Sequence, residues 1–307
     1  MFHKFELYYP RMKRAIRIMV SRHSAFYSPL IAAIAAGFLE QEGIEATYGV
    51  LQPGQRSHAL LREGAVDVFQ SAVSSSWGPL EKGERDLPVH FAQVNQCDGF
   101  FLVARRPIHD FEWTMLEAAA VLADHGGQPL AMLKYAARCQ GVDWNRIRVI
   151  DAGSPPEMER VFRGGSGDFV HLQGPVAQQL EVEAIGWIVA SAGEAMPPVA
   201  FSSLLARREF LETDEAHAFL RAYRRAREWA DQAPAREVAR AEAHFFPGVS
   251  FNALGAAVAR YQQLGCWDGG IEIPRALYEQ ALEVFLTAGT IGRRHPYEEV
   301  VVTPCIE

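Results

Sequence analysis

The chain has 307 residues, of which 49% are hydrophobic and 22% are charged, so it is long enough for roughly two globular domains with a sizeable core. Its formal net charge of −7 argues against nucleic acid or an anionic membrane surface as a partner. No stretch of the sequence is long and apolar enough to predict a membrane span.

A strand–helix rhythm is predicted for the first part of the chain. Apolar or alternating stretches indicate strands, and helical spacing follows most of them. Ser28 followed by Pro29 is typical of a helix start, because serine caps a helix and proline suits its first position. The predicted strands cover residues 15–20, 44–50, 66–70 and 89–94. This order is typical of a mostly parallel sheet with crossover helices.

A second unit of the same kind is predicted further along the chain. A buried strand at 118–123 leads through Gly126 and Gly127 into a helix that starts at Pro129. Such a helix start presents free backbone N–H groups and the positive end of the helix dipole, which suit an acceptor-rich or anionic group. Later strands of this unit are predicted at 147–150, 169–172 and 185–190.

The chain is expected to cross twice between the two units. Arg105, Arg106 and Pro107 break the pattern after an apolar strand at 99–104, and the stretch 199–206 leads back. The expected domains are a first lobe of residues 1–103 and 200–307 and a second lobe of residues 104–199. Amphipathic helices are predicted from Arg207 onward, and residues 298–303 are expected to be extended.

Several runs resemble type II periplasmic binding proteins, in particular those that bind alkanesulfonates, nitrate and thiamine-pyrimidine precursors. They are G-F-L-E-Q-E-G-I (37–44), G-A-V-D-V (64–68), H-F-F-P-G-V-S (244–250), Y-Q-Q-L-G-C-W (261–267) and I-P-R-A-L-Y-E (273–279). The resemblance covers residues 15–292 and implies an α/β fold with two lobes, two mostly parallel sheets flanked by helices, and a central cleft. It also implies a small-molecule ligand, hinge closure, and an ABC transporter permease or regulatory protein as partner.

Ligands of open α/β sheets bind at the carboxyl ends of the strands, where loops lead into helices. In the first lobe this rule selects His23, Ser24, Tyr27, Ser74, Ser75, Gln93 and Asn95, with Ser202 and Ser203 where the chain returns. In the second lobe it selects His125, Gly126, Gln128, Asp151, Ser154, His171, Gln173 and Ser191. Few cationic side chains are in this set, which favours a polar, heterocyclic or mono-anionic ligand over a multiply charged anion.

Some of these residues have structural alternatives. Ser74 and Ser75 could cap their own helix, and Asp151 could satisfy N–H groups of its turn. His125 and His171 are the preferred ligand contacts, because each follows or ends a strand just before a helix start. Histidine spacing indicates no metal site, and no Walker or G-x-G-x-x-G loop indicates a nucleotide, so neither metal nor cofactor is expected.

Two functions are compatible with the resemblance. The first is an ABC-transporter-type solute-binding protein. The second is a cytoplasmic enzyme on the same fold, similar to chorismate dehydratase or to enzymes of pyrimidine precursors, in which His125 or His171 acts as acid or base and Asp151 orients it. The cysteine-rich run of the fungal pyrimidine-phosphate synthases has no counterpart here, which argues against that particular chemistry.

The cysteines and the N-terminus bear on location. Cys97, Cys139, Cys266 and Cys305 are far apart in sequence and indicate neither a disulfide framework nor a zinc site, which suits a reducing compartment. The N-terminus carries no apolar run of signal-peptide length. The sequence as it stands is therefore expected to be cytoplasmic, and periplasmic if a leader has been removed.

Overall fold

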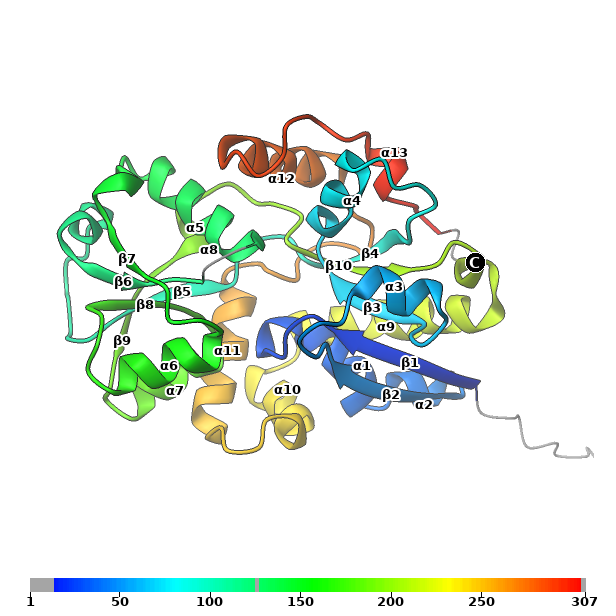
Figure 1. The fold of residues 1–307 in the computed structure, drawn as a ribbon. Coiled ribbons are helices and arrows are strands. Elements are labelled where there is room, and N and C mark those ends of the chain that lie inside the picture. Colours follow the sequence, from blue (N-terminus) through cyan, green and yellow to red (C-terminus); the bar gives the residue numbers. More distant parts are fainter. Residues whose placement is uncertain (1–13, 125–126, 305–307) are drawn as a thin grey trace, which may run out of the picture.

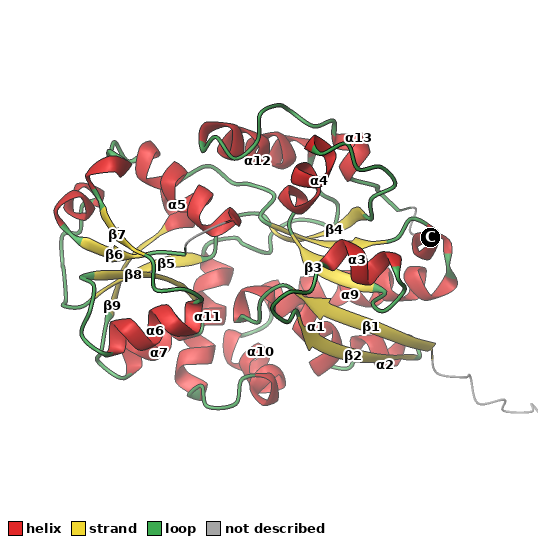
Figure 2. Ribbon diagram, viewed as in Figure 1, coloured by secondary structure: helices red, strands yellow, loops and turns green. Residues whose placement is uncertain are grey.

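The computed structural model describes residues 14–124 and 127–304, which form two lobes, each built on a five-stranded sheet with helices on both sides (Figure 1, Figure 2). In the first lobe the spatial order is β2-β1-β3-β10-β4. These strands are β1 (Arg14–Val20), β2 (Ile44–Val50), β3 (Val68–Ser71), β4 (Val89–Asn95) and β10 (Ser202–Ala206). All seven residues of β4 are buried, including the polar side chains of His90, Gln93 and Asn95.

The second sheet has the order β7-β6-β8-β5-β9. Its strands are β5 (Phe100–Ala104), β6 (Ala120–Leu122), β7 (Arg148–Ile150), β8 (Phe169–Gln173) and β9 (Trp187–Ser191). One strand in each sheet is antiparallel to its neighbours, namely β10 in the first sheet and β5 in the second. Both are strands that the chain enters just after crossing from the other lobe. The predicted α/β fold class with two mostly parallel, helix-flanked sheets is confirmed.

The first crossing between the lobes lies earlier in the chain than predicted, because β5 belongs to the second sheet. Strand β5 pairs with β8 and β9, so the chain leaves the first sheet at residues 96–99 rather than after residue 103. The apolar run that forms β5 would suit either core, and only its pairing partners determine the sheet that it joins. The return crossing runs from α8 (Ala192–Ala195) to β10.

The helices follow the predicted alternation. They are α1 (Ser28–Ala35), α2 (Phe38–Gln41), α3 (Ser57–Arg62), α4 (Trp77–Glu81), α5 (Gly127–Cys139), α6 (Pro155–Arg163), α7 (Val176–Val182), α9 (Asp214–Gln232), α10 (Ala235–Glu242), α11 (Phe251–Gln263), α12 (Arg275–Thr287) and α13 (Tyr297–Val300). Short 3₁₀ turns include η1 (Ala25–Tyr27), η2 (Val73–Ser76) and η6 (Ala243–Phe245). Among the described residues, no helix is long and apolar enough to cross a membrane.

Two local predictions were wrong. Ser28 does not cap α1 but is its first residue, and its hydroxyl donates to Glu242 Oε2 at 2.7 Å. In the stretch 298–303, predicted to be extended, residues 298–300 belong to helix α13, whose N-cap is Pro296, and Val301 then forms a bridge with His90.

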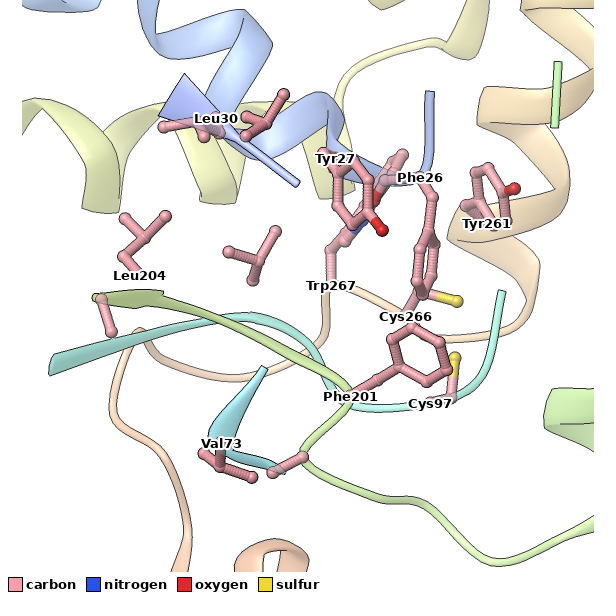
Figure 3. Packing of buried hydrophobic residues seen from close by; sticks show 14 of the residues in the cluster. Phe26, Tyr27, Leu30, Val73, Cys97, Phe201, Leu204, Tyr261, Cys266 and Trp267 are labelled. Atoms are coloured by element: carbon pink, nitrogen blue, oxygen red, sulfur yellow. The ribbon is translucent and has the colours of Figure 1, made fainter. Parts of the chain in front are cut away.

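The junction between the lobes is a packed aromatic core (Figure 3). Phe26 meets Phe201 edge to face, with ring centroids 5.2 Å apart, and packs against Tyr261 of α11. The indole Nε1 of Trp267 donates to Phe26 O at 3.1 Å and to Asn95 Oδ1 at 2.9 Å. The C-terminal segment 261–267 therefore fastens the first crossing to the start of the chain.

Candidate ligand-binding cleft

Two neighbouring cavities lie between the lobes. The larger, about 420 Å³, is called the proline cavity here because Pro155, Pro156 and Pro175 form part of its wall. Its other lining residues are Ser21, Arg22, His23, Ser24, Val50, Leu51, Phe100, Ser154, Glu159, Leu172, Gln173, Gly174 and Val176. Because much of this wall is aliphatic, the proline cavity suits the carbon skeleton of a small organic molecule. The carboxylate of Glu159 is already paired with Arg163 at 2.7 Å.

The second cavity, about 300 Å³, is called the serine cavity because hydroxyl and amide groups dominate its lining. These groups belong to Ser21, Gln70, Ser71, Ser74, Ser75, Gln128, Gln173 and Ser202; Arg22, Tyr27, Ala72, Phe100, Gly127, Pro129, Phe201 and Phe285 complete the wall. Most of the polar residues follow a strand or open a helix, which is where the carboxyl ends of the strands meet in an open sheet.

Arg22 lies where the two cavities meet. Ser21, Arg22, Phe100 and Gln173 line both cavities. The Nη2 atom of Arg22 pairs with Asp124 of the second lobe, whose side chain is only 5% exposed. The Nη1 atom is buried and has no hydrogen-bond partner within residues 14–124 and 127–304. A buried guanidinium N–H without an acceptor is costly, so this atom marks a place for an anionic or strongly accepting group.

Further hydrogen bonds join the lobes around the cavities. Ser24 Oγ donates to the Gly174 carbonyl at 2.6 Å, and Ser74 Oγ donates to Gln128 Oε1 at 2.8 Å. Gln128 Nε2 in turn donates to Phe201 O at 2.6 Å. The cleft is therefore closed by polar contacts that a ligand could extend or replace.

Many of the residues predicted for the site line the cavities. His23, Ser24 and Ser154 line the proline cavity, Tyr27, Ser74, Ser75, Gln128 and Ser202 line the serine cavity, and Gln173 lines both. Their polar atoms differ in availability. Ser154 is engaged in a capping box with Glu157 at the start of α6, whereas the buried Ser75 hydroxyl has no acceptor or donor in the described part of the chain.

Both ring nitrogens of His23 are engaged. Nε2 lies 2.8 Å from the Phe245 carbonyl, which can only accept, so in the neutral ring Nδ1 accepts from the Tyr48 hydroxyl at 2.8 Å. Desolvation lowers the pKa of His23, which favours this neutral form. His23 therefore presents the face or edge of a neutral ring, without a positive charge, to the proline cavity. Burial raises the pKa of Tyr27, which keeps its hydroxyl protonated at the serine cavity.

Several predicted residues lie elsewhere. Gln93, Asn95, His171 and Ser191 are buried and line neither cavity. Asn95 accepts from Trp267, and the backbone N–H of Gln93 donates to the Ile271 carbonyl at 2.6 Å, so both hold the C-terminal segment against β4. Ser203, also selected by the strand-end rule, lies 2.7 Å from His90 Nδ1 inside the first lobe. The strand-end rule selected these residues by position, whereas the twist of each strand decides which side of the sheet they face.

His171 and Asp151 are not hydrogen-bonded to each other. His171 is stacked on Phe100, with ring centroids 4.4 Å apart, and no described residue hydrogen-bonds to either of its ring nitrogens. Burial, aided by the charge of Arg22, lowers the pKa of His171 to about 3. Asp151 is exposed and accepts from the Gly153 N–H at 2.9 Å, as a turn residue does. His125 and Gly126 lie outside the described residues.

Arg22, the cationic residue of the cleft, was not among the residues predicted from the sequence. Arg22 stands directly beside the predicted His23 and Ser24, and a basic side chain at the end of β1 was the available signal. Its acidic partner follows β6, about a hundred residues away in the chain. Among the described residues, no group of His, Cys, Asp or Glu side chains is arranged to hold a metal ion.

Comparisons with known proteins agree with this architecture. No family model matches the chain. YtlA of Bacillus subtilis, a proposed binding protein, is 26% identical over 290 residues, which are 93% of this chain and 87% of YtlA. The periplasmic aliphatic sulphonate binding protein SsuA from Escherichia coli superposes with a TM-score of 0.73 at 14% identity, covering 96% of this chain and 94% of SsuA.

A second solved structure leads to the same conclusion. The alkanesulfonate-binding protein SsuA from Xanthomonas axonopodis pv. citri, bound to MOPS, also superposes with a TM-score of 0.73 at 14% identity, covering 95% of this chain and 99% of that protein. With two crossings between two mixed sheets and cavities at their carboxyl edges, the chain has the fold of the type II periplasmic binding protein superfamily.

Proposed function

We propose that this protein binds a small organic mono-anion between its lobes, with the anionic group at Arg22 and the carbon skeleton in the proline cavity. The observation that carries the proposal is the buried Nη1 atom of Arg22 at the junction of the two cavities, without a partner among the described atoms. An anionic oxygen there would accept the hydrogen bond that Nη1 lacks.

The charges around the cleft favour a single negative charge on the ligand. Arg22 is the only lysine or arginine among the described residues that line the two cavities, and Asp124 already neutralises part of its charge. A multiply charged anion would leave charge uncompensated in a partly desolvated site. The serine cavity can solvate the remaining oxygens of the anionic group through its hydroxyl and amide groups.

The relatives support the same class of ligand. Alkanesulfonates, for which the two SsuA proteins are named, combine one anionic group with an apolar chain, and the two cavities offer matching surroundings. By the same analogy we infer that the closed, loaded form is recognised by an ABC transporter permease and that the protein acts outside the cytoplasm. Recovery of the native protein from a periplasmic or secreted fraction would support this location.

Titration calorimetry tests the ligand class with three probes of similar size: butanesulfonate, pentanoate and butanol. We expect one or both anions to bind the wild-type protein and butanol to bind far more weakly. Arg22→Ala should lower the affinity for the binding anion roughly 10- to 100-fold, since a hydrogen bond to a charged group contributes about 1.5–3 kcal/mol.

Arg62→Ala is the matched control. Arg62 also pairs with a carboxylate, that of Glu84 at 2.8 Å, but it lies on the exposed surface of the first lobe, away from both cavities. The control should bind the anion as the wild type does. Tighter binding of butanol than of either anion, or unchanged anion affinity in Arg22→Ala, would refute the proposed ligand class. Mass spectrometry of the natively purified protein identifies any ligand that it retains.

A further inference from the structure

Two cysteines that are far apart in sequence come together at the lobe junction. Cys97 lies in the first crossing, between β4 and β5, and is 6% exposed. Cys266 follows α11 and is fully buried. Figure 3 shows both sulfur atoms in the space beside Phe26 and Phe201.

Hydrogen bonds hold the two segments that carry the cysteines next to each other. The N–H of Gln96, next to Cys97, donates to the carbonyl of Cys266 at 3.0 Å, and the side chain of Gln96 donates to Gly265 O at 3.1 Å. Trp267 anchors the other side of the same turn through its bonds to Phe26 O and Asn95 Oδ1. The chain segments that carry the thiols are thus fixed against each other by main-chain and buried side-chain contacts.

The thiols themselves interact. Burial raises the pKa of the Cys266 thiol well above its ordinary value, and a hydrogen bond with the neighbouring Cys97 thiol raises it further. Figure 3 places both sulfur atoms beside the same two aromatic rings, and a backbone hydrogen bond joins the segments that carry them, which is the kind of approach that a disulfide requires. Cys139, in contrast, is exposed at the end of α5.

We propose that Cys97 and Cys266 form a disulfide bond when the protein folds under oxidising conditions. The oxidant is a small or protein disulfide donor. A thiolate of one cysteine attacks the donor disulfide, giving a mixed disulfide and one released thiolate. The second cysteine then displaces the other donor sulfur, so that two thiols lose two protons and two electrons while the donor disulfide is reduced to two thiols.

The bond would fasten the first crossing to the turn after α11. Because the closed loop would span the second lobe and most of the C-terminal helices, it would restrict the unfolded chain strongly. Neither cysteine lines the proline cavity or the serine cavity, so the bond would form away from the ligand site. We therefore expect oxidation to stabilise the fold while leaving the affinity of the cleft within about twofold.

The experiment uses the full-length protein, refolded with oxidised and reduced glutathione or with dithiothreitol. Each sample is unfolded in N-ethylmaleimide without reductant, digested and analysed by mass spectrometry. The oxidised sample should yield a peptide pair linked through Cys97 and Cys266, with only Cys139 and Cys305 alkylated. Its melting temperature should exceed that of the reduced sample by several degrees.

Cys139→Ser is the matched control and should keep both the linked peptide and the redox-dependent melting temperature. Cys97→Ala and Cys266→Ala should each lose both. Alkylation of all four cysteines in the oxidised wild-type sample, or a bond between Cys139 and Cys305 in place of the proposed one, would overturn the proposal. The peptide analysis of the wild type decides the matter even where a variant fails to fold.

Discussion

Arg22 is close enough for its charge to affect the pKa of His171, but the two side chains differ in exposure. The Arg22 side chain is 30% exposed and reaches the cleft, whereas His171 is fully buried against Phe100. Desolvation, with the positive charge of Arg22 added, lowers the pKa of His171 to about 3, so the ring is neutral at physiological pH. A neutral histidine without a hydrogen-bond partner among the described residues acts in this position as an aromatic packing residue.

The pKa of His171 predicts acid sensitivity. Its folded-state pKa of about 3 lies below the ordinary value of 6.5, so between these values the unfolded state binds the proton and the folded state does not. The stability that depends on the neutral ring is complete above pH 6.5 and is lost as the pH falls toward 3. His171→Phe should reduce the pH dependence of the free energy of unfolding between pH 6 and 4.5 by about 1 kcal/mol per pH unit.

Urea denaturation at several pH values measures this dependence. His90→Phe is the comparison variant, because burial also lowers the pKa of His90 to about 3 while its ring is hydrogen-bonded to Ser203. That variant should also lessen the acid sensitivity, but it should lose stability at pH 7.5 since the Ser203 hydroxyl loses its partner. An unchanged pH profile in His171→Phe would contradict the assignment of a buried neutral ring.

At the scale of secondary structure elements, α11 ties the two lobes together through one hydroxyl group. Tyr261 OH accepts from the Gly174 N–H at 2.7 Å and donates to the Gly99 carbonyl at 3.0 Å. Gly99 belongs to the first crossing, and Gly174 lies between β8 and α7 in the wall of the proline cavity. The helix therefore positions a cavity wall as well as the first crossing.

Tyr261→Phe should destabilise the protein by about 1–3 kcal/mol, because two buried backbone groups lose their partner. It should also lower the affinity for the cleft ligand several-fold, since the carbonyl of Gly174 and the neighbouring Gln173 would shift. Chemical denaturation and titration calorimetry measure the two effects.

Tyr223→Phe is the control that separates the loss of stability from the loss of ligand affinity. The hydroxyl of Tyr223 donates to the Gln93 carbonyl at 2.8 Å, inside the first lobe and away from both cavities. This variant should lose stability but keep the ligand affinity of the wild type. Equal losses of affinity in both tyrosine variants would show that α11 has no special part in shaping the cleft.

For the molecule as a whole, the ion pair between Arg22 and Asp124 links the lobes across the cleft. Asp124 supplies a carboxylate at the place where the proposed ligand brings its anionic group, so protein and ligand compete for the same guanidinium. The Arg22–Asp124 pair therefore favours the closed form without ligand and weakens the binding of an anion.

Asp124→Asn should therefore have two linked consequences. The unliganded protein should have a larger radius of gyration in X-ray scattering, because a charged contact between the lobes is lost. The affinity for the binding anion should rise several-fold, because Arg22 no longer has an internal counter-ion.

Glu117→Gln is the corresponding control. Its carboxylate pairs with Arg146 at 2.5 Å within the second lobe, so neither the radius of gyration nor the affinity should change. Identical scattering from Asp124→Asn and wild type in the absence of ligand would exclude Asp124 as a closing contact.

Much of this molecule was predictable from local pattern alone. Apolar runs and helix starts predicted the strands and helices, because side-chain periodicity and backbone preference act over a few residues. The strand-end rule brought His23, Ser24, Ser74 and Gln128 to the cleft, since parallel strands present their carboxyl ends at one edge. The motif runs along the chain indicated the superfamily fold before any packing was known.

The tertiary structure decided everything that depends on contacts between distant segments. Strand β5 joins the second sheet because it lies between β8 and β9, Arg22 meets Asp124 across the cleft, and Cys97 meets Cys266 at the junction. Asn95 accepts a hydrogen bond from Trp267 at the lobe junction. These pairings follow from how two lobes pack and how each strand twists, and neither is encoded in the spacing of residues along a single segment.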